Sequence, residues 1–204
     1  AIKGVVGKPK ASVLAERLRL INPQAEIKSV PWAYDERTSS MLLEGRKRPD
    51  YVIDAIDNVS TKCHLLAKCR ELSIPIVCST GASGRWDPTK IQVTDLAKTT
   101  VDPLAQAVRK ILRKKHSFPR KGKFGITAVF STESLQNPEV LAYDRKGEFQ
   151  CVCPNGDNDF HSCDSRSVIW GTAGFVTGSF GLTCASVAIR EILENKYNEE
   201  QIHS

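Results

Sequence analysis

A short apolar run that ends in two polar residues constrains the fold of this 204-residue chain more than any other segment. The run covers residues 51–56 and is charged only at Asp54, and Asp57 and Asn58 follow it where a helical pattern begins. In an open α/β sheet, ligands bind at the carboxyl ends of strands, beside the amino ends of helices. Asp57 is therefore a candidate site residue, and helix capping by Asp57 or Asn58 is the alternative.

Strand and helix patterns alternate on both sides of this run. Short apolar runs predict strands, and apolar residues at helical spacing predict helices. The expected strands are residues 26–30, 51–56, 74–80, 91–93 and 125–130, and the expected helices are residues 9–21, 39–43, a segment from 58, a segment from 102 and a long C-terminal helix. This order indicates an α/β fold with a doubly wound, mostly parallel sheet.

The net charge of +6 comes from one segment, residues 109–123. This basic segment contains eight Lys or Arg and no acid, and the rest of the chain holds 21 basic and 23 acidic residues. The eight cations are Arg109, Lys110, Arg113, Lys114, Lys115, Arg120, Lys121 and Lys123. Such a block fits a polyanion, RNA before a membrane, because neutralised phosphates release counterions. A solvated helix end and loop is the alternative.

Three features bear on compartment, membrane insertion and metal binding. Seven cysteines without a preceding signal peptide indicate a reduced intracellular compartment. Residues 168–189 carry no charge, but four glycines there favour a buried or interface helix over a membrane span. A polar loop is expected at residues 134–167. Its Cys151, Cys153, His161 and Cys163 offer four possible zinc ligands, and a reactive cysteine or thiols without a role are the alternatives.

Four segments together resemble one family. They are residues 6–10 with the later Ile21-Asn22-Pro23, then residues 50–58, 80–103 and 129–133. The first two are similar to motifs found across E1-like activating enzymes. The last two resemble the tRNA threonylcarbamoyladenosine dehydratases specifically. The resemblance covers residues 6–135 well and the C-terminal helix loosely.

The resemblance implies a fold and an activity. The fold would be a Rossmann-like sheet of the E1-like activating-enzyme type, with C-terminal antiparallel strands and a long C-terminal helix. Family members use ATP and Mg²⁺ to adenylate the threonyl carboxylate of N6-threonylcarbamoyladenosine beside the anticodon of tRNA, and loss of AMP closes a ring. A homodimer is implied, and the compartment would be the cytoplasm, or an association with mitochondria in a eukaryote.

The resemblance also implies roles for individual residues. Lys10 would contact the ATP phosphates, Asp57 would hold Mg²⁺, and Asn22 and Asn58 would support the pocket. A branch-specific surface near the pocket would contain Asp87, Lys90, Asp95 and Lys98. Carboxylate oxygens suit Mg²⁺, and a lysine supplies positive charge against the leaving pyrophosphate.

The family's Gly-rich nucleotide loop and first two strands would precede Lys10. Residues 1–204 are therefore expected to form a single but partial E1-like adenylation domain, which alone neither folds cooperatively nor binds ATP. Two other functions stay open at this point. One is adenylation of a ubiquitin-like or sulfur-carrier protein at its C-terminus, and the other is a catalytically inactive RNA-binding remnant.

Overall fold

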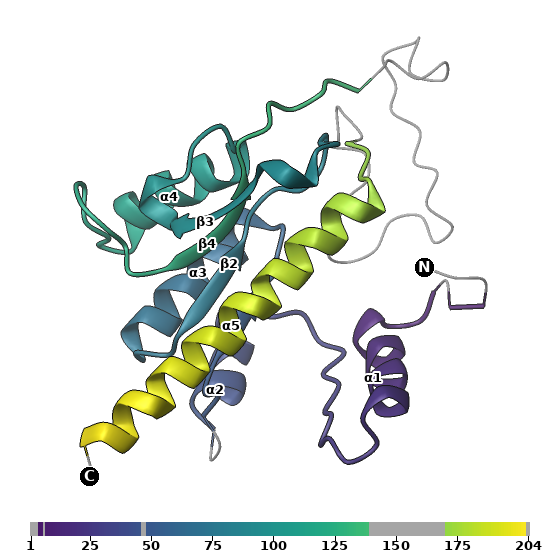
Figure 1. Ribbon diagram of the computed structural model, residues 1–204. Helices are drawn as coiled ribbons and strands as arrows, with labels where there is room; N and C mark the ends of the chain where they lie inside the picture. The colour runs from purple at the N-terminus through teal and green to yellow at the C-terminus, as the bar shows by residue number, and fades with distance from the viewer. Residues whose placement is uncertain (1–3, 6, 46–47, 139–169, 203–204) are drawn as a thin grey trace. The chain divides into compact units, whose positions relative to one another are not determined.

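The computed structural model describes residues 4–5, 7–45, 48–138 and 170–202 (Figure 1). The chain divides into two compact units, one formed by Ala1–Ala33 with Glu139–Ile169 and the other by Tyr34–Pro138 with Trp170–Ser204. Most of the expected loop at residues 134–167 lies outside the described residues, as do the four possible zinc ligands.

In the first unit the described structure is one helix, α1 (Lys10–Ile21), followed by a turn and by chain without regular secondary structure. Leu14, Leu18 and Ile21 give this helix an apolar stripe, and all three are exposed. The prediction of a strand at residues 26–30 is wrong, because this segment is not part of a sheet. A strand exists only through hydrogen bonds to a neighbour, and no described segment supplies one here.

The second unit is built on a four-stranded sheet with the order β1-β2-β4-β3. Its strands are β1 (Val52–Asp54), β2 (Ile76–Ser79), β3 (Ile91–Asp95) and β4 (Thr127–Ser131). Strands β1, β2 and β4 run parallel, and β3 pairs with β4 in the antiparallel direction. This confirms the mostly parallel sheet with an antiparallel strand, and β1 forms an edge with no described partner on its free side.

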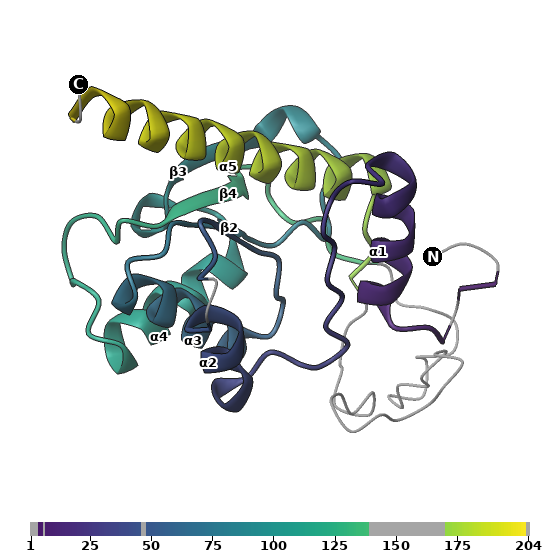
Figure 2. The same ribbon diagram turned by 90° about the horizontal axis from the view of Figure 1, so that it is seen from below.

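Helices cover both faces of this sheet (Figure 2). Helices α3 (Val59–Glu71) and α4 (Pro103–Lys115) pack on one face and α5 (Gly174–Ile202) packs on the other, while α2 (Glu36–Leu43) contacts α3. Alternate residues of β2 point to opposite faces, so Ile76 and Cys78 join the α3 and α4 core and Val77 joins the α5 core. Two short 3₁₀ helices, η1 (Pro88–Lys90) and η2 (Leu96–Lys98), flank β3.

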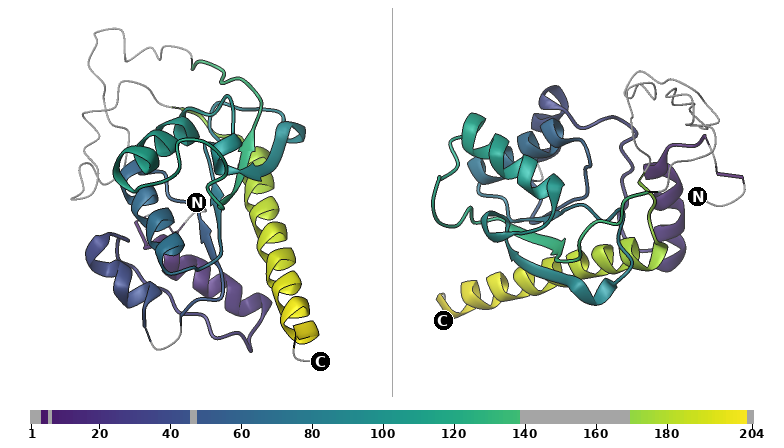
Figure 3. Two further views of the ribbon diagram at one scale, coloured as in Figure 1. Left: turned by 90° about the vertical axis from the view of Figure 1, so that its left-hand side faces the viewer. Right: turned by 90° about the horizontal axis from the view of Figure 1, so that it is seen from above.

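Helix α5 packs across one face of the sheet and contacts β1, β2 and β4; two further views show its course (Figure 3). Its buried stripe consists of Val176, Phe180, Cys184, Val187 and Ala188. By length and composition alone, residues 174–195 are also sufficient to cross a membrane. A second set of apolar side chains on α5, defined here as the outer stripe, is exposed and consists of Phe175, Leu182, Ile189 and Leu193.

Candidate functional site at the carboxyl edge of the sheet

The carboxyl ends of β1, β2 and β4 lie at the same edge of the sheet because these strands are parallel. Asp57 and Asn58 follow β1, residues 80–84 follow β2, and residues 132–133 follow β4. This edge is where an open α/β sheet binds ligands. Lys10 and Asn22 belong to the other compact unit.

Asn58, and not Asp57, caps helix α3. The side-chain oxygen of Asn58 accepts a hydrogen bond from the backbone N–H of Thr61 at 3.1 Å. Asp57 is exposed, and among the described residues its carboxylate has no hydrogen bond or ion pair. The capping alternative therefore applies to Asn58 and leaves the oxygens of Asp57 available to a ligand.

The backbone just before Asp57 is held by a buried ion pair. Lys62 on α3 and Asp54 at the end of β1 lie 2.7 Å apart, and both side chains are fully buried. Asp54 accepts a hydrogen bond from the N–H of Ile56 at 3.0 Å, and Lys62 donates one to the carbonyl of Ile56 at 2.9 Å. Burial opposes the charged form of Lys62, but the adjacent Asp54 carboxylate outweighs it and raises the Lys62 pKa. The peptide groups of Ile56 are thus fixed on both sides.

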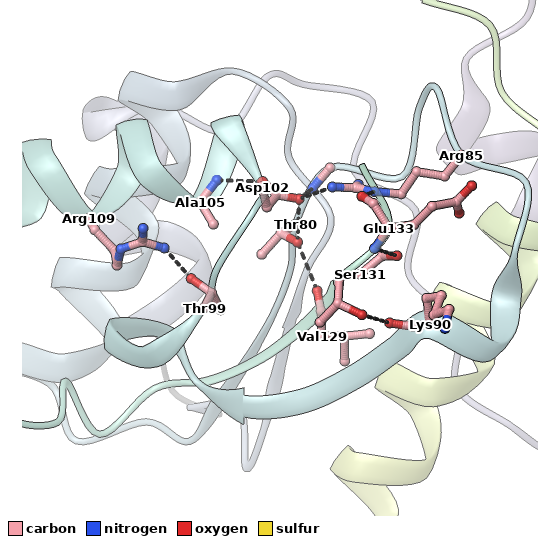
Figure 4. A network of polar contacts seen from close by, with 12 residues as sticks. Thr80, Arg85, Lys90, Thr99, Asp102, Ala105, Arg109, Val129, Ser131 and Glu133 are labelled. Atoms are coloured by element: carbon pink, nitrogen blue, oxygen red, sulfur yellow. Dashed lines mark hydrogen bonds and ion pairs between the residues drawn. The ribbon is translucent and has the colours of Figure 1, made fainter. Parts of the chain in front are cut away.

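A second buried network joins the loop after β2 to the start of α4 (Figure 4). One carboxylate oxygen of Asp102 accepts hydrogen bonds from the hydroxyl of Thr80 at 3.0 Å, the N–H of Gly81 at 3.0 Å and the guanidinium of Arg85 at 3.1 Å. The other oxygen caps α4 by accepting from the N–H of Ala105 at 2.7 Å. Both Arg85 and Asp102 are buried, so each charge depends on the other.

Glu133, which follows β4, holds the same loop from the other side. Its carboxylate accepts hydrogen bonds from the backbone N–H groups of Trp86, at 3.0 and 3.1 Å, and Asp87, at 2.9 Å. Its carbonyl accepts from Arg85 at 3.4 Å. The sequence indicates Glu133 only as part of a family-like segment and gives no signal for Arg85. The acid after the expected strand at 125–130 was the available signal, but its partners are 46 to 48 residues away in sequence.

The four residues expected on one branch-specific surface lie at two opposite edges of the sheet. Lys90 and Asp87 lie at the carboxyl edge, where the carbonyl of Lys90 accepts from the N–H of Thr132 at 3.1 Å. Asp95 pairs with Thr127 at the start of β4, and Lys98 follows it in η2. Because β3 is antiparallel to β4, it carries the chain to the opposite edge, so the expected position of Asp95 and Lys98 near Asp57 is wrong.

The basic segment forms a groove on one side of α4. The groove encloses about 540 Å³ and is lined by Gln106, Arg109, Lys110, Arg113, Lys114 and Arg120. No acid is among these lining residues, and burial together with nearby Arg113 lowers the Arg109 pKa. Lys115, Lys121 and Lys123 do not line the groove, so the structure divides the eight predicted cations into five and three.

No group of three or more His, Cys, Asp or Glu side chains within the described ranges is arranged to hold a metal ion. The described cysteines Cys63, Cys69, Cys78 and Cys184 are free and buried. An Mg²⁺ ion that also uses phosphate oxygens needs only one or two protein carboxylates, and Asp57 offers one. Asp57 therefore fits the chemistry of such an ion.

A mostly parallel sheet with helices on both faces and polar loops at its carboxyl edge is a doubly wound α/β domain of the Rossmann-like, E1-like type. The ThiF family model matches residues 1–204. Curated tRNA threonylcarbamoyladenosine dehydratases are similar to the chain: the Haemophilus influenzae protein is 39% identical over 199 residues, which is 96% of this chain and 70% of that protein. The Escherichia coli protein is 37% identical over 202 residues, covering 95% of this chain and 69% of that protein.

Solved structures agree with these relatives. The Escherichia coli dehydratase, TcdA, in complex with ATP superposes with a TM-score of 0.77 at 36% identity, and its complex with AMP gives 0.79 at 35% identity. Both matches cover 97% of this chain, and they cover 69% and 70% of the solved chains. The chain belongs to the ThiF family, in its tRNA threonylcarbamoyladenosine dehydratase branch. The family resemblance and the E1-like fold expected from the sequence are thereby confirmed.

Proposed function

We propose that the protein catalyses the ATP-dependent dehydration of N6-threonylcarbamoyladenosine in tRNA, through adenylation of the threonyl carboxylate. The observation that carries this proposal is Asp57, exposed and without a partner among the described residues, on a backbone held by Lys62 and Asp54. The dehydratase relatives, one of them solved with ATP and with AMP, support the substrate and the nucleotide.

The proposal assigns a role to each predicted site residue. Asp57 would hold Mg²⁺, and this ion would supply positive charge against the phosphates of the nucleotide. Lys10 is exposed in the first turn of α1, where its ammonium group and the helix amino end both favour a phosphate. Asn22 would support the nucleotide pocket. Asn58 would do so through its side-chain NH₂, because its side-chain oxygen is used by the cap of α3.

The basic groove is proposed to bind the tRNA backbone. Its five cations face one cavity without a lining acid, which gives a local field suited to consecutive phosphates. The three other cations of the segment, Lys115, Lys121 and Lys123, would add only long-range attraction. We place the protein in the cytoplasm, where this substrate would reach it.

A homodimer is the proposed assembly, and α5 supplies its interface. The outer stripe of α5 repeats at intervals of seven residues from Phe175 to Leu182 to Ile189, so these side chains share one face of the helix. An exposed apolar row of this kind is typical of a protein interface.

The decisive experiment measures ATP–pyrophosphate exchange with tRNA that carries threonylcarbamoyladenosine. In a protein that supplies the complete nucleotide site, we expect exchange that depends on this tRNA and disappears in Asp57→Asn, because the amide removes the negative ligand for Mg²⁺. Asp50→Asn is the matched control, since Asp50 is exposed and precedes β1 at the opposite edge. Exchange stimulated by a carrier protein with a Gly-Gly end, and not by tRNA, would contradict the proposal, as would tRNA binding without any nucleotide binding.

The expectation that residues 1–204 alone neither fold cooperatively nor bind ATP stays a prediction. Thermal unfolding of this 204-residue chain with and without Mg-ATP tests it directly. A single sharp transition that moves to higher temperature with Mg-ATP would contradict the expectation and leave the proposed activity intact.

A further inference from the structure

Two consecutive residues in the loop after β2 have opposite environments. Arg85 is 2% exposed and forms the buried ion pair with Asp102, whereas Trp86 is 64% exposed. The chain therefore anchors one side chain inside the domain and presents the next to solvent. Leaving an indole in water forgoes the free energy that its burial would give, so a fixed and exposed tryptophan is a candidate contact residue.

The backbone at Trp86 is held by contacts on both sides in sequence. Its own N–H and that of Asp87 donate to the Glu133 carboxylate. Two residues earlier, the Gly84 N–H donates to the Gly171 carbonyl at 2.9 Å, and the Gly84 carbonyl accepts from the N–H of Gln136 at 2.8 Å. Because this loop is already held by hydrogen bonds, its backbone would lose little conformational entropy when a partner binds Trp86.

Gly84 also brings a second aromatic ring to the loop. Its φ is +65°, and a Cβ atom at this position would lie 3.0 Å from a ring carbon of Trp170. Any larger residue would displace that ring. Trp170 is itself 38% exposed, so this part of the carboxyl edge carries two partly or largely exposed indoles.

The same loop is connected to the helix that carries the basic groove. Asp102 binds Arg85 with one carboxylate oxygen and caps α4 with the other, as Figure 4 shows. Later turns of α4 contribute four of the five groove cations. Exposed aromatic rings and a cationic groove are the two elements with which proteins bind single-stranded nucleic acid. Both belong here to the same compact unit.

We propose that Trp86 is a base-stacking residue, whose indole stacks on an unpaired nucleobase of the RNA substrate. The inference rests on the proposed function, and it specifies how the RNA is held at the carboxyl edge. The unpaired bases of an anticodon loop expose their faces, and aromatic side chains recognise RNA mainly by stacking on such bases. The groove on α4 would bind phosphates elsewhere on the same molecule.

The test compares Trp86→Ala, Trp86→Phe and Trp32→Ala with the wild-type protein. Trp32 is the matched control because it is 60% exposed but belongs to the other compact unit. For Trp86→Ala we expect the KM for tRNA and the Kd of its anticodon stem-loop to rise roughly tenfold, with the KM for ATP unchanged. Trp86→Phe should retain most of the affinity, and Trp32→Ala all of it. Unchanged unfolding temperatures would show that each variant is folded.

The outcomes separate the two levels of the proposal. If the wild-type protein modifies tRNA and the Trp86→Ala variant binds the same tRNA with unaltered affinity, the stacking role alone is overturned. A Trp86→Ala variant that loses self-association, with unchanged tRNA affinity per protomer, would identify Trp86 as a protein contact and also overturn the inference. Wild-type protein that neither binds nor modifies tRNA would overturn the proposed function together with this inference.

Discussion

Lys62 and Asp54 form an ion pair of 2.7 Å in which neither side chain is exposed to solvent. Together they bind the N–H and the carbonyl of Ile56, the residue immediately before Asp57. The position of the exposed carboxylate at the sheet edge is therefore set by two charges inside the domain. Removing either charge affects both the stability of the fold and the geometry of the candidate site.

The first prediction concerns this ion pair and, like the others, applies to a protein that supplies the complete nucleotide site. Lys62→Met should lower the free energy of unfolding by about 3–5 kcal/mol, because it leaves the Asp54 carboxylate buried without a counter-charge. The double variant Lys62→Met with Asp54→Asn should recover most of that loss. Urea unfolding of the single and double variants measures the coupling. Additive losses in the double variant would mean that the two side chains do not depend on each other.

Among the acidic residues at the carboxyl edge, Asp102 is expected to contribute most to the stability of the fold. Asp102→Ala removes the cap of α4 and the only ion-pair partner of Arg85 within the described part of the chain, which should cost about 3–5 kcal/mol. Asp102→Asn keeps an oxygen for the cap and should cost less. Thermal unfolding compares both variants with Asp50→Asn, an exposed control. Equal stability of the alanine variant and the control would refute the structural role of Asp102.

The buried thiols should resist alkylation in the folded protein. Burial raises the pKa of Cys63 to about 11 and that of Cys69 to about 12, and it also raises those of Cys78 and Cys184. Thiolate is the reactive form, and at pH 8 roughly one Cys63 thiol in a thousand would be ionised. Peptide mass spectrometry after iodoacetamide treatment should detect these four sites only in denaturant. Rapid labelling of Cys63 in native protein would contradict this.

The division of the basic segment gives a charge-matched comparison. Replacing Lys110, Lys114 and Arg120 by Gln removes three groove cations, and replacing Lys115, Lys121 and Lys123 by Gln removes three others. All six residues are exposed, so neither set should change the stability of the fold substantially. We expect the groove set to reduce the salt dependence of tRNA binding by about 0.7 in log–log slope per lost phosphate contact. Equal slopes for the two sets would exclude a specific role of the groove.

The outer stripe of α5 predicts an effect on assembly. Leu182 is 75% exposed at its centre, and Leu182→Glu would place a charge inside the proposed interface. We expect sedimentation to show a dimer for the wild-type protein and a monomer for this variant, with an unchanged unfolding temperature at low concentration. Thr183→Glu serves as a neighbouring control, because Thr183 lies outside the outer stripe. A monomeric wild-type protein would refute the interface.

Periodic patterns predicted most elements of the second unit correctly. The helix at α4 shows why, since its apolar residues recur at helical spacing and an Asp-Pro pair marks its start. The expected strand at residues 26–30 was wrong because local propensity does not supply a hydrogen-bonded neighbour. The sequence of β3 also did not predict that this strand runs antiparallel to β4. That direction decides which of Asp87, Lys90, Asp95 and Lys98 lie near the candidate site.

The sequence by itself determined the class of fold, the family and the candidate residue Asp57, because these depend on local patterns and contiguous motifs. It also located the basic segment, since charge is a property of composition. Only the tertiary structure decided that Asn58 is the cap and that Lys62 and Asp54 hold the backbone before Asp57. It alone paired Arg85 with Asp102 and Glu133 with the backbone of Trp86. These contacts join residues that are distant in sequence, and a buried charge reveals its partner only when the chain is folded around it.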